Sequence, residues 1–363
     1  MLKIEPRPQP SRLMSYLSPL IAVGLTLVTG LIFSILIGLN PLLAFHAFFI
    51  APIDDLYGLG ELGVKAAPLM LIAVGLAIGF RANVWNIGAE GQLTMGAIFG
   101  GGLGLYFYES ESGWLLPAMI VFGAFGGMMW ASIPAFLRTR FSTNEILVSL
   151  MLNYVAVLVL SYLVHGPWRD PDGFNFPESR IFSDAGTLPI ILAETRLHIG
   201  ILLALGAVIL GWVFVRKSFV GYQMQVVGMA EFAARYAGFK RSRMVWTGLL
   251  VGGGAAGVAG LCEVAGPIGQ LLPSVSPGYG YAAIIVAFVG RLHPVGIMLA
   301  SLLMSLLYLG GETAQMDLGL PSAITGVFQG VLLFYLLAAD LFINFRLRVA
   351  RAAVVLSVKG SAS

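Results

Sequence analysis

The residues best suited to polar chemistry form the stretch NVWNIGAEGQ, from Asn83 to Gln92, which lies between two strongly apolar runs. Its amide and carboxylate side chains donate and accept hydrogen bonds. Burying a neutral polar group without a partner costs roughly 2–7 kcal/mol. Such groups persist at membrane depth only where they face a cavity, water or a partner helix. The stretch therefore predicts either contact with a polar solute or hydrogen bonds that brace neighbouring helices.

Two glycines in this stretch, Gly88 and Gly91, permit a bend or the close approach of another backbone. A further amide, Asn153, lies about two turns into a later apolar run, where it either lines a path or joins two helices. We assign the following polar and aromatic residues to a candidate polar path: Asn83, Trp85, Asn86, Glu90, Gln92, Asn153 and Gln270.

Motifs for covalent or metal chemistry are missing from the sequence. It contains no G-x-x-x-x-G-K-[ST] nucleotide-binding loop, no H-E-x-x-H pair and no G-x-S-x-G nucleophile motif. The four histidines are scattered, and the single cysteine, Cys262, lies inside an apolar run, where we expect it to serve as a small packing residue. We therefore expect no catalytic residue, metal or cofactor in this chain.

The composition indicates a membrane protein that would position these polar residues on helices. Of the 363 residues, 58% are hydrophobic and 11% are charged, and the mean hydropathy is +0.88. Soluble domains are typically about 25% charged. Many apolar runs approach the roughly 20 residues that span a bilayer as a helix. We therefore predict an all-α polytopic membrane protein with about ten spans, some of them broken or re-entrant. The expected spans cover residues 18–39, 62–80, 93–108, 114–137, 146–165, 198–215, 243–262, 280–290, 294–309 and 323–343.

The distribution of basic residues predicts the orientation. Of the 21 Lys and Arg residues, only Lys65, Arg169, Arg180 and Arg196 fall on the opposite side from the N-terminus. Basic residues favour the cytoplasmic side, so both termini are expected there. The predicted parts are an N-terminal tail (1–17), a membrane domain (18–343) with an outer loop (166–197) and an inner loop (217–244), and a C-terminal tail (344–363).

The inner loop contains the sequence MAEFAARYAGF, which predicts a short helix. Its alanines favour a helix, and Gly238, followed by basic residues, is a typical stop. Two roles stay open on physical grounds: docking into a groove of another protein, or lying on the membrane surface as an amphipathic helix.

This segment resembles the coupling helix of ATP-binding-cassette importer permeases of the ribose and branched-chain amino acid type. The resemblance implies that the segment contacts an ATPase. The residues to which it assigns that role are Gly228, Glu231, Ala233, Ala234, Arg235 and Gly238.

The run NIGAEGQ, from Asn86 to Gln92, resembles one branch of the same family. Permeases of that branch serve nucleoside importers that work with a binding lipoprotein of the basic-membrane-protein type. The resemblance extends from about Arg81 to Asp340. A sister permease of such systems usually has a hydrophobic residue at the position of Gln92, so the resemblance places this chain on one side of a heterodimer.

The resemblance implies an importer permease in the bacterial inner membrane, with no ATPase site of its own. It implies ATPase subunits that hold ATP and Mg²⁺, a second related permease chain, and a periplasmic or lipid-anchored solute-binding protein. Nucleic acid is not an expected partner. A nucleoside or related purine-like solute is the first expectation, and a monosaccharide is the alternative.

The resemblance also implies two related halves. The polar, Gly- and Pro-rich stretch from Gly266 to Arg291 is a weak match to the region around Asn86. The main rival function is an ion-gradient-driven transporter, which would also use broken helices but would not need a docking helix in a cytoplasmic loop.

Overall fold

The computed structural model describes residues 2–7, 9 and 11–349. Leu39–Gln329 form one compact unit, and the two ends of the chain, up to Gly38 and from Gly330, form a second. Within the described residues the structure consists of helices, apart from loops and one short ribbon of two strands. This confirms the predicted all-α class of membrane protein.

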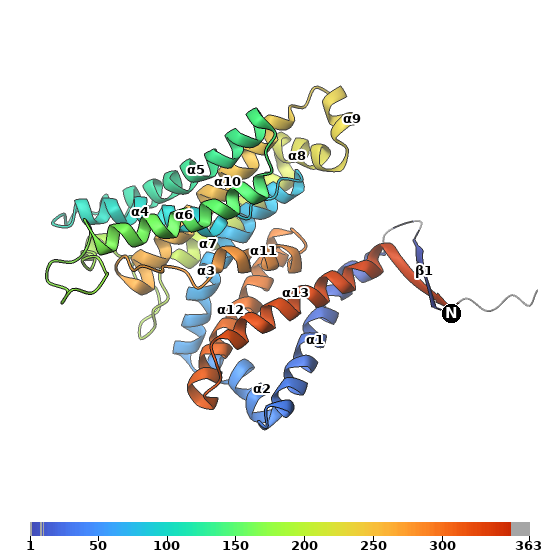
Figure 1. Cartoon of the computed structure of the whole chain (residues 1–363), viewed down its shortest axis with the longest axis horizontal. Coiled ribbons are helices and arrows are strands. Elements are labelled where there is room, and N and C mark those ends of the chain that lie inside the picture. Colours follow the sequence, from blue (N-terminus) through green and yellow to red (C-terminus); the bar gives the residue numbers. More distant parts are fainter. Residues whose placement is uncertain (1, 8, 10, 350–363) are drawn as a thin grey trace, which may run out of the picture. The chain divides into compact units, whose positions relative to one another are not determined.

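The larger unit contains the polar stretch and both long loops (Figure 1). Its helices are α2 (Pro41–Phe49), α3 (Leu56–Arg81), α4 (Ala89–Tyr106), α5 (Leu115–Phe141), α6 (Glu145–His165), α7 (Gly200–Lys217), α8 (Phe219–Met229), α9 (Glu231–Tyr236), α10 (Arg241–Glu263), α11 (Tyr279–Val289), α12 (Pro294–Leu318) and the start of α13 (Ala323–Asn344). A π-helical turn, Val264–Ile268, continues α10, and 3-10 turns lie at Ala51–Ile53 and Asp184–Gly186.

The centre of the larger unit is α10, which packs against α3, α4 and α5 (Figure 1). Small residues make this packing possible, since a methyl group added at Gly96 of α4 would overlap the backbone of Gly257 in α10. Membrane helices approach closely where glycine and alanine line the contact. The glycine-rich sequence of α10 thus brings the helix that carries Glu90 and Gln92 into the core.

The smaller unit consists of α1 (Arg12–Leu36), the rest of α13, and an antiparallel ribbon of β1 (Leu2–Pro6) with β2 (Phe345–Val349). The Ser18 hydroxyl donates to Asp340 Oδ1 at 2.7 Å, and the hydroxyls of Thr29 and Tyr335 are 2.8 Å apart. These polar pairs join α1 to α13 within this unit.

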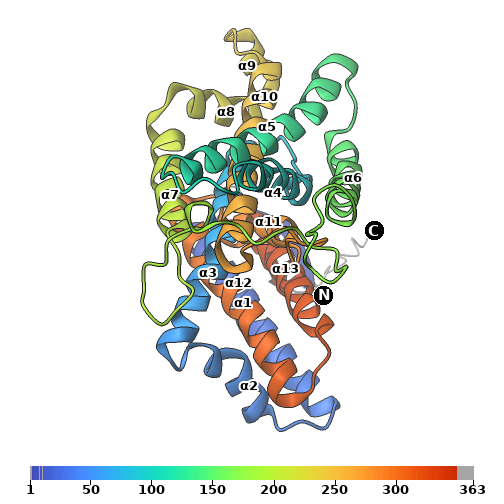
Figure 2. The same ribbon diagram turned by 90° about the vertical axis from the view of Figure 1, so that its left-hand side faces the viewer.

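The outer loop between α6 and α7 crosses over the end of α10 (Figure 2). The backbone N–H groups of Ser179, Phe182 and Leu188 donate to the carbonyl groups of Leu271, Gly269 and Ala265 at 3.0, 2.9 and 2.8 Å, respectively. The π-helical turn and the chain after it are therefore paired with loop backbone rather than with lipid.

Each predicted span corresponds to a helix, with different ends. Among the described residues, eight helices are long and apolar enough to cross a membrane. The expected span at 280–290 is the helix α11, which has only 11 residues and is too short to cross a bilayer. The helix expected at 93–108 starts earlier, at Ala89, and the helix expected at 198–215 starts later, at Gly200. Helices α2 and α8 were not predicted.

Candidate solute path and coupling segment

The polar stretch begins where α3 ends and the chain turns back. Asn83 adopts a left-handed backbone conformation, with φ of 55°, which asparagine tolerates better than most residues. Residues 82–88 form the break, and Glu90 and Gln92 lie in the first turn of α4. The irregular segment therefore covers only the first part of the stretch from Asn83 to Gln92, and the rest of the stretch is helical.

The two amides of the motif pair with each other. Asn86 Nδ2 donates to Gln92 Oε1 at 2.8 Å, and Gln92 Nε2 donates to Asn86 Oδ1 at 3.1 Å. The backbone N–H of Gly88 donates to the same Asn86 oxygen at 3.0 Å. Both side chains are buried, at 2% and 1% exposure. The break is therefore closed by its own side chains.

Asn153 of α6 joins three segments. Its Oδ1 accepts the backbone N–H of Gly91 at 2.9 Å, and its Nδ2 donates to the Ile87 carbonyl and to the Tyr281 hydroxyl, both at 3.0 Å. A methyl group added at Gly91 would crowd the Asn153 backbone, so glycine lets α4 and α6 approach closely here. A single buried amide of α6 thus connects the break, α4 and α11.

Glu90 connects the break at residues 82–88 with a second break, the irregular segment that precedes α11. Its Oε2 accepts the backbone N–H of Gly280 at 2.7 Å, in the first turn of α11. A methyl group at Gly280 would overlap the Glu90 backbone. A carboxylate is favoured at a helix N-terminus, where backbone N–H groups lack partners within the helix. Each break consists of an irregular segment between two helices. That the two breaks belong to two related halves of the chain stays a prediction.

Asn83 and Trp85 lie beside this cluster, at the end of α3. The indole N–H of Trp85 donates to Asn83 Oδ1 at 2.9 Å, and its ring stacks on Phe288 with centroids 5.7 Å apart. The backbone N–H of Trp85 donates to Glu145 Oε1 at 3.3 Å, and the same carboxylate pairs with Arg138. These contacts hold the break against α6 and α11.

Gln270 lies apart from the other candidate residues. It follows the π-helical turn, and its Nε2 donates to Glu178 of the outer loop at 3.0 Å. The structure therefore brings Asn86, Glu90, Gln92 and Asn153 into one cluster, with Asn83 and Trp85 at its edge, and leaves Gln270 with the loop. Whether these residues contact a solute stays a prediction.

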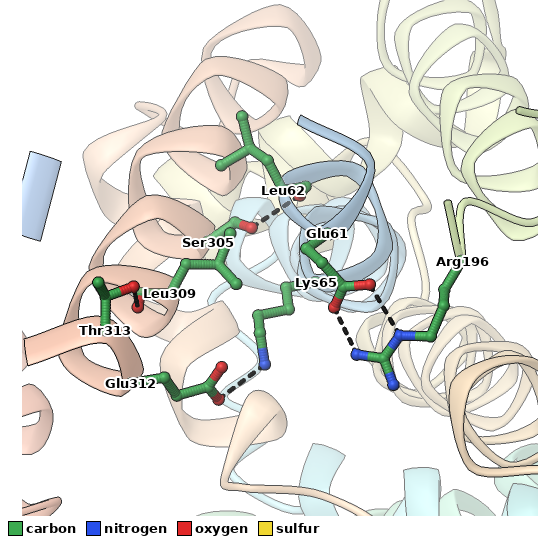
Figure 3. A network of polar contacts seen from close by, with 8 residues as sticks. All are labelled: Glu61, Leu62, Lys65, Arg196, Ser305, Leu309, Glu312 and Thr313. Atoms are coloured by element: carbon green, nitrogen blue, oxygen red, sulfur yellow. Dashed lines mark hydrogen bonds and ion pairs between the residues drawn. The ribbon is translucent and has the colours of Figure 1, made fainter. Parts of the chain in front are cut away.

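A network of charged residues on α3 was missed by the sequence analysis (Figure 3). The buried Glu61 carboxylate forms a two-pronged ion pair with Arg196 of the outer loop, with distances of 2.8 Å to Nε and 2.6 Å to Nη2. Lys65, one turn further along α3, pairs with Glu312 of α12 at 2.8 Å. The hydrogen bonds that Arg196 donates to the Glu61 carboxylate raise the pKa of Arg196 above its usual value. The signal in the sequence was the four-residue spacing of Glu61 and Lys65, which places both on one helix face.

His198 lies in the outer loop beside this network. Its Nδ1 accepts the backbone N–H of Gly200 at 3.1 Å, so the ring is held with Nδ1 unprotonated. The ring is almost fully buried, and desolvation lowers the pKa of His198 to about 4, against an opposing effect of the Glu61 charge. His198 is therefore a neutral structural residue at pH 7.

The predicted coupling segment forms a helix turn exposed between α8 and α10 (Figure 1). Helix α9 covers Glu231–Tyr236, and Gly238, with φ of 82°, ends the turn as the sequence predicted. Glu231 pairs with Arg241 at 2.5 Å, and Ala234 points into the protein. Gly228, in α8, packs against the end of α3, where a methyl group would overlap the Arg81 carbonyl.

The side chains exposed on this segment include large aromatic and apolar residues as well as small ones. Phe232 and Tyr236 are 89% and 98% exposed, and Met229, just before α9, is 81% exposed. Ala233, Arg235 and Gly238 are also exposed. Exposed aromatic residues of this kind are typical anchors in protein interfaces. We name residues 228–238 the coupling segment, and its contact with an ATPase stays a prediction.

Among the described residues, no group of three or more His, Cys, Asp or Glu side chains is arranged to hold a metal ion.

Comparison with known proteins gives a consistent result over most of the chain. The family model for the branched-chain amino acid transport system permease component matches residues 58–337. The chain is 33% identical to the glucose ABC transporter permease protein TsgB13 of Haloferax volcanii, over 96% of this chain and 94% of that one. It is 29% identical to the guanosine ABC transporter permease protein NupP of Bacillus subtilis, over 89% and 93% of the two chains, and 26% identical to the nucleoside ABC transporter permease protein NupB of Lactococcus lactis, over 93% and 94%. No solved structure matches.

Proposed function

Since the chain belongs to the family of branched-chain amino acid transport system permease components, a family of multi-pass ABC transporter permeases, we propose that it is the membrane subunit of an importer for a nucleoside or related purine-like solute. The observation that carries this proposal is the similarity to the guanosine and nucleoside permeases over about nine-tenths of each chain. The NIGAEGQ motif, from Asn86 to Gln92, independently favours the same branch.

Energy is supplied by separate ATPase subunits, which bind ATP and Mg²⁺, and this chain binds no cofactor. The exposed Phe232 and Tyr236 support a docking role for the coupling segment, because two large aromatic side chains in water are otherwise unfavourable. The ion pair between Glu231 and Arg241 fixes the base of the segment, so that movement of the docked ATPase is transmitted into α10.

A second, related permease chain and a periplasmic or lipid-anchored binding protein complete the importer. Bacillus subtilis supplies an example of two such chains, since this chain is 29% identical to NupP and 26% identical to NupQ, both named as guanosine permeases. Gln92 favours placing this chain on one side of a heterodimer. We place the importer in the inner membrane, with both termini in the cytoplasm.

In this proposal the cluster around Asn86, Glu90 and Asn153 braces the break instead of binding solute. Each of these side chains makes its hydrogen bonds inside the fold. Each would have to give up one of these bonds in order to bind a solute, which favours the bracing role. A solute that passed beside the cluster would contact its edge, at the exposed Asn83 and the partly exposed Trp85.

A monosaccharide is the second candidate solute. The observation in its favour is the 33% identity to a glucose permease over 96% of this chain, which exceeds the identity to the nucleoside permeases. Both solute classes carry a ring with several hydroxyl groups, so the same hydrogen-bonding surface can serve either.

The test is uptake by the complete importer. The chain is co-purified with its ATPase, second permease and binding protein, reconstituted in proteoliposomes, and assayed with labelled guanosine and labelled glucose. We expect ATP-dependent uptake of guanosine that is lost when the ATPase is inactivated by mutation. Uptake of glucose alone would establish the second candidate, and uptake driven by an ion gradient without the ATPase would contradict the importer.

A further inference from the structure

A polar cavity of about 420 Å³ lies between α12 and the start of α13, within the larger unit. Pro277, from the irregular segment before α11, closes one side. The other lining residues are Tyr308, Gly311, Glu312, Gln315, Ser322, Ala323, Thr325, Gly326 and Gln329. None of them belongs to the cluster around Asn86, so this is a separate site.

The lining residues follow a helical pattern on both walls. On α12 the positions are 308, 311, 312 and 315. On the other wall the patterned positions are 322, 325, 326 and 329, with Ser322 just before α13 and the apolar Ala323 lining the cavity outside the pattern. Each set has the spacing i, i+3, i+4, i+7, which places its members on one helix face. Each face carries one glycine and three polar side chains. Helix faces that contact lipid are apolar, so two polar faces opposite one another indicate a site for something polar.

Small residues set the width of the cavity. A methyl group added at Gly311 would overlap the hydroxyl of Thr325, so glycine is required for the two walls to approach at this level. Gly326 lies on the opposite wall one residue further on. The polar side chains on either side of this contact therefore stand at a fixed separation across the cavity.

The hydrogen-bonding groups of the cavity are partly engaged. The side chains of Tyr308 and Gln329 are joined by a hydrogen bond across the cavity, and the Tyr308 ring packs edge-on against Tyr279 with centroids 5.4 Å apart. Lys65 holds Glu312 through Oε1 (Figure 3). A carboxylate has about four acceptor sites, so Glu312 keeps the capacity to accept hydrogen bonds from a ligand. Gln315 is exposed to the cavity mouth and offers both a donor and an acceptor.

We propose that this cavity binds the hydroxyl-bearing ring of the transported solute, a pentose in a nucleoside or a free hexose. The assignment rests on the proposed function and names the part of the solute that is recognised. Glu312 accepts hydrogen bonds from ring hydroxyls, Gln315 supplies an amide, and Tyr308 provides an aromatic wall for the ring. A volume of about 420 Å³ falls within the roughly 300–1,000 Å³ of small-molecule pockets.

The position of the cavity fits an early contact of the solute with the permease. Glu312 pairs with Lys65, one of the four basic residues predicted on the outer side. A solute released there by a binding protein would meet the cavity before it reached the break at Asn86. The ion pair also fixes the Glu312 carboxylate in one orientation, which lowers the entropy cost of binding.

The first experiment is cysteine protection in the complete importer. Cys262 is the only cysteine and is 1% exposed, so the unmodified chain gives a low labelling background. Gln315→Cys places a thiol in the cavity wall, and Met316→Cys places one on the adjacent residue, which is 77% exposed and does not line the cavity. A membrane-impermeant maleimide is applied with the binding protein either empty or loaded with guanosine or glucose.

We expect the loaded binding protein to slow labelling of the Gln315→Cys variant and to leave the Met316→Cys variant unchanged. Protection by guanosine alone identifies the ring as part of a nucleoside, and protection by glucose alone identifies a free hexose. Equal labelling with empty and loaded binding protein, in an importer that still takes up solute, would overturn the cavity assignment and leave the proposed function intact. Absence of uptake of either solute by the unmodified importer would overturn both.

The second experiment separates binding from assembly. Gln315→Leu keeps the side-chain volume and removes the hydrogen bonds, so we expect KM for uptake to rise about tenfold, the effect of about one lost hydrogen bond. Met316→Leu is the control and should leave KM unchanged. Co-purification of the second permease is measured in parallel. Loss of that chain from the Gln315→Leu importer would identify the cavity as a subunit contact and overturn the proposal.

Discussion

Glu90 and Gly280 lie 190 positions apart in the chain, and the Glu90 carboxylate accepts the Gly280 backbone N–H at 2.7 Å. The bond joins the first turn of α4 to the first turn of α11. Helix α11 has 11 residues, which is too short to cross a bilayer, so its N-terminus lies inside the protein. Glu90 supplies the acceptor that this buried helix end requires.

Replacing Glu90 by alanine should therefore destabilise the fold. A buried N–H group left without an acceptor costs about 1–3 kcal/mol. We expect Glu90→Ala to lower the thermal unfolding temperature of the purified chain in detergent, whereas Glu90→Gln, which keeps a carbonyl acceptor, should lower it less. Glu109→Ala, at an exposed carboxylate after α4, is the control. Equal unfolding temperatures for Glu90→Ala and the control would contradict the bracing role.

The sequence located the site of the buried polar cluster, because amides and a carboxylate interrupt an apolar run there. It did not predict the partners, because Asn153 and Gly280 are 62 and 190 positions from the residues they contact. Hydropathy located all the long helices, since burial in lipid selects apolar residues whatever the packing. It missed α8, because a helix of 11 residues is too short to give the signal of a membrane span.

The charge network on α3 was missed for a related reason. Glu61 and Lys65 are visible in the sequence as two charges in an apolar run, and their spacing places them on one face. Their partners, Arg196 and Glu312, come from a loop and from α12, and only the fold brings them together. Pairing explains how the charges persist in a helix that is otherwise buried and apolar.

Removing one member of the Glu61–Arg196 pair should lower the free energy of unfolding more than removing both charges does. Arg196→Met leaves the Glu61 carboxylate, which is 5% exposed, without its partner. Losing one member of a buried pair costs about 3–5 kcal/mol, and because the Arg196 side chain is 51% exposed to solvent we expect about 1–3 kcal/mol. The double variant Glu61→Leu/Arg196→Met should regain part of this loss. Thermal unfolding of the two single variants and the double variant tests this, and simple additivity of the two single effects would contradict it.

His198 should make the protein sensitive to acid. Burial lowers the pKa of His198 to about 4 from an ordinary value of 6.5, so the unfolded chain takes up a proton at a higher pH than the folded chain does. The contribution of the neutral ring to stability is complete above about pH 6.5 and is lost as the pH falls toward about 4. We expect the unfolding temperature to decrease across this window.

The matched variant for this prediction is His198→Asn. Its side-chain oxygen can accept the Gly200 N–H in place of Nδ1, and it does not titrate. The decrease in unfolding temperature between pH 6.5 and 4 should be smaller in this variant than in the unmodified chain. The same decrease in both proteins would mean that other groups cause the acid sensitivity.

The coupling segment should affect ATPase binding without affecting stability. Phe232 and Tyr236 are almost fully exposed, so replacing both with alanine removes few contacts within the chain. If they are anchors for the ATPase, their loss should weaken its association about tenfold or more, because aromatic anchors carry a large share of interface energy. Co-purified ATPase and ATP-dependent uptake should both fall, while the unfolding temperature of the isolated chain stays within about 1 °C.

The control for this prediction is Tyr106→Ala, at a tyrosine that is 82% exposed at the far end of α4. It removes a similar exposed aromatic surface on the side predicted to face away from the cytoplasm. If Tyr106→Ala and the double variant reduced ATPase binding equally, the effect would come from loss of general hydrophobic surface. If neither reduced it, the ATPase would have to bind elsewhere, and the exposed aromatic residues of α9 would fit the alternative role as a membrane-surface helix.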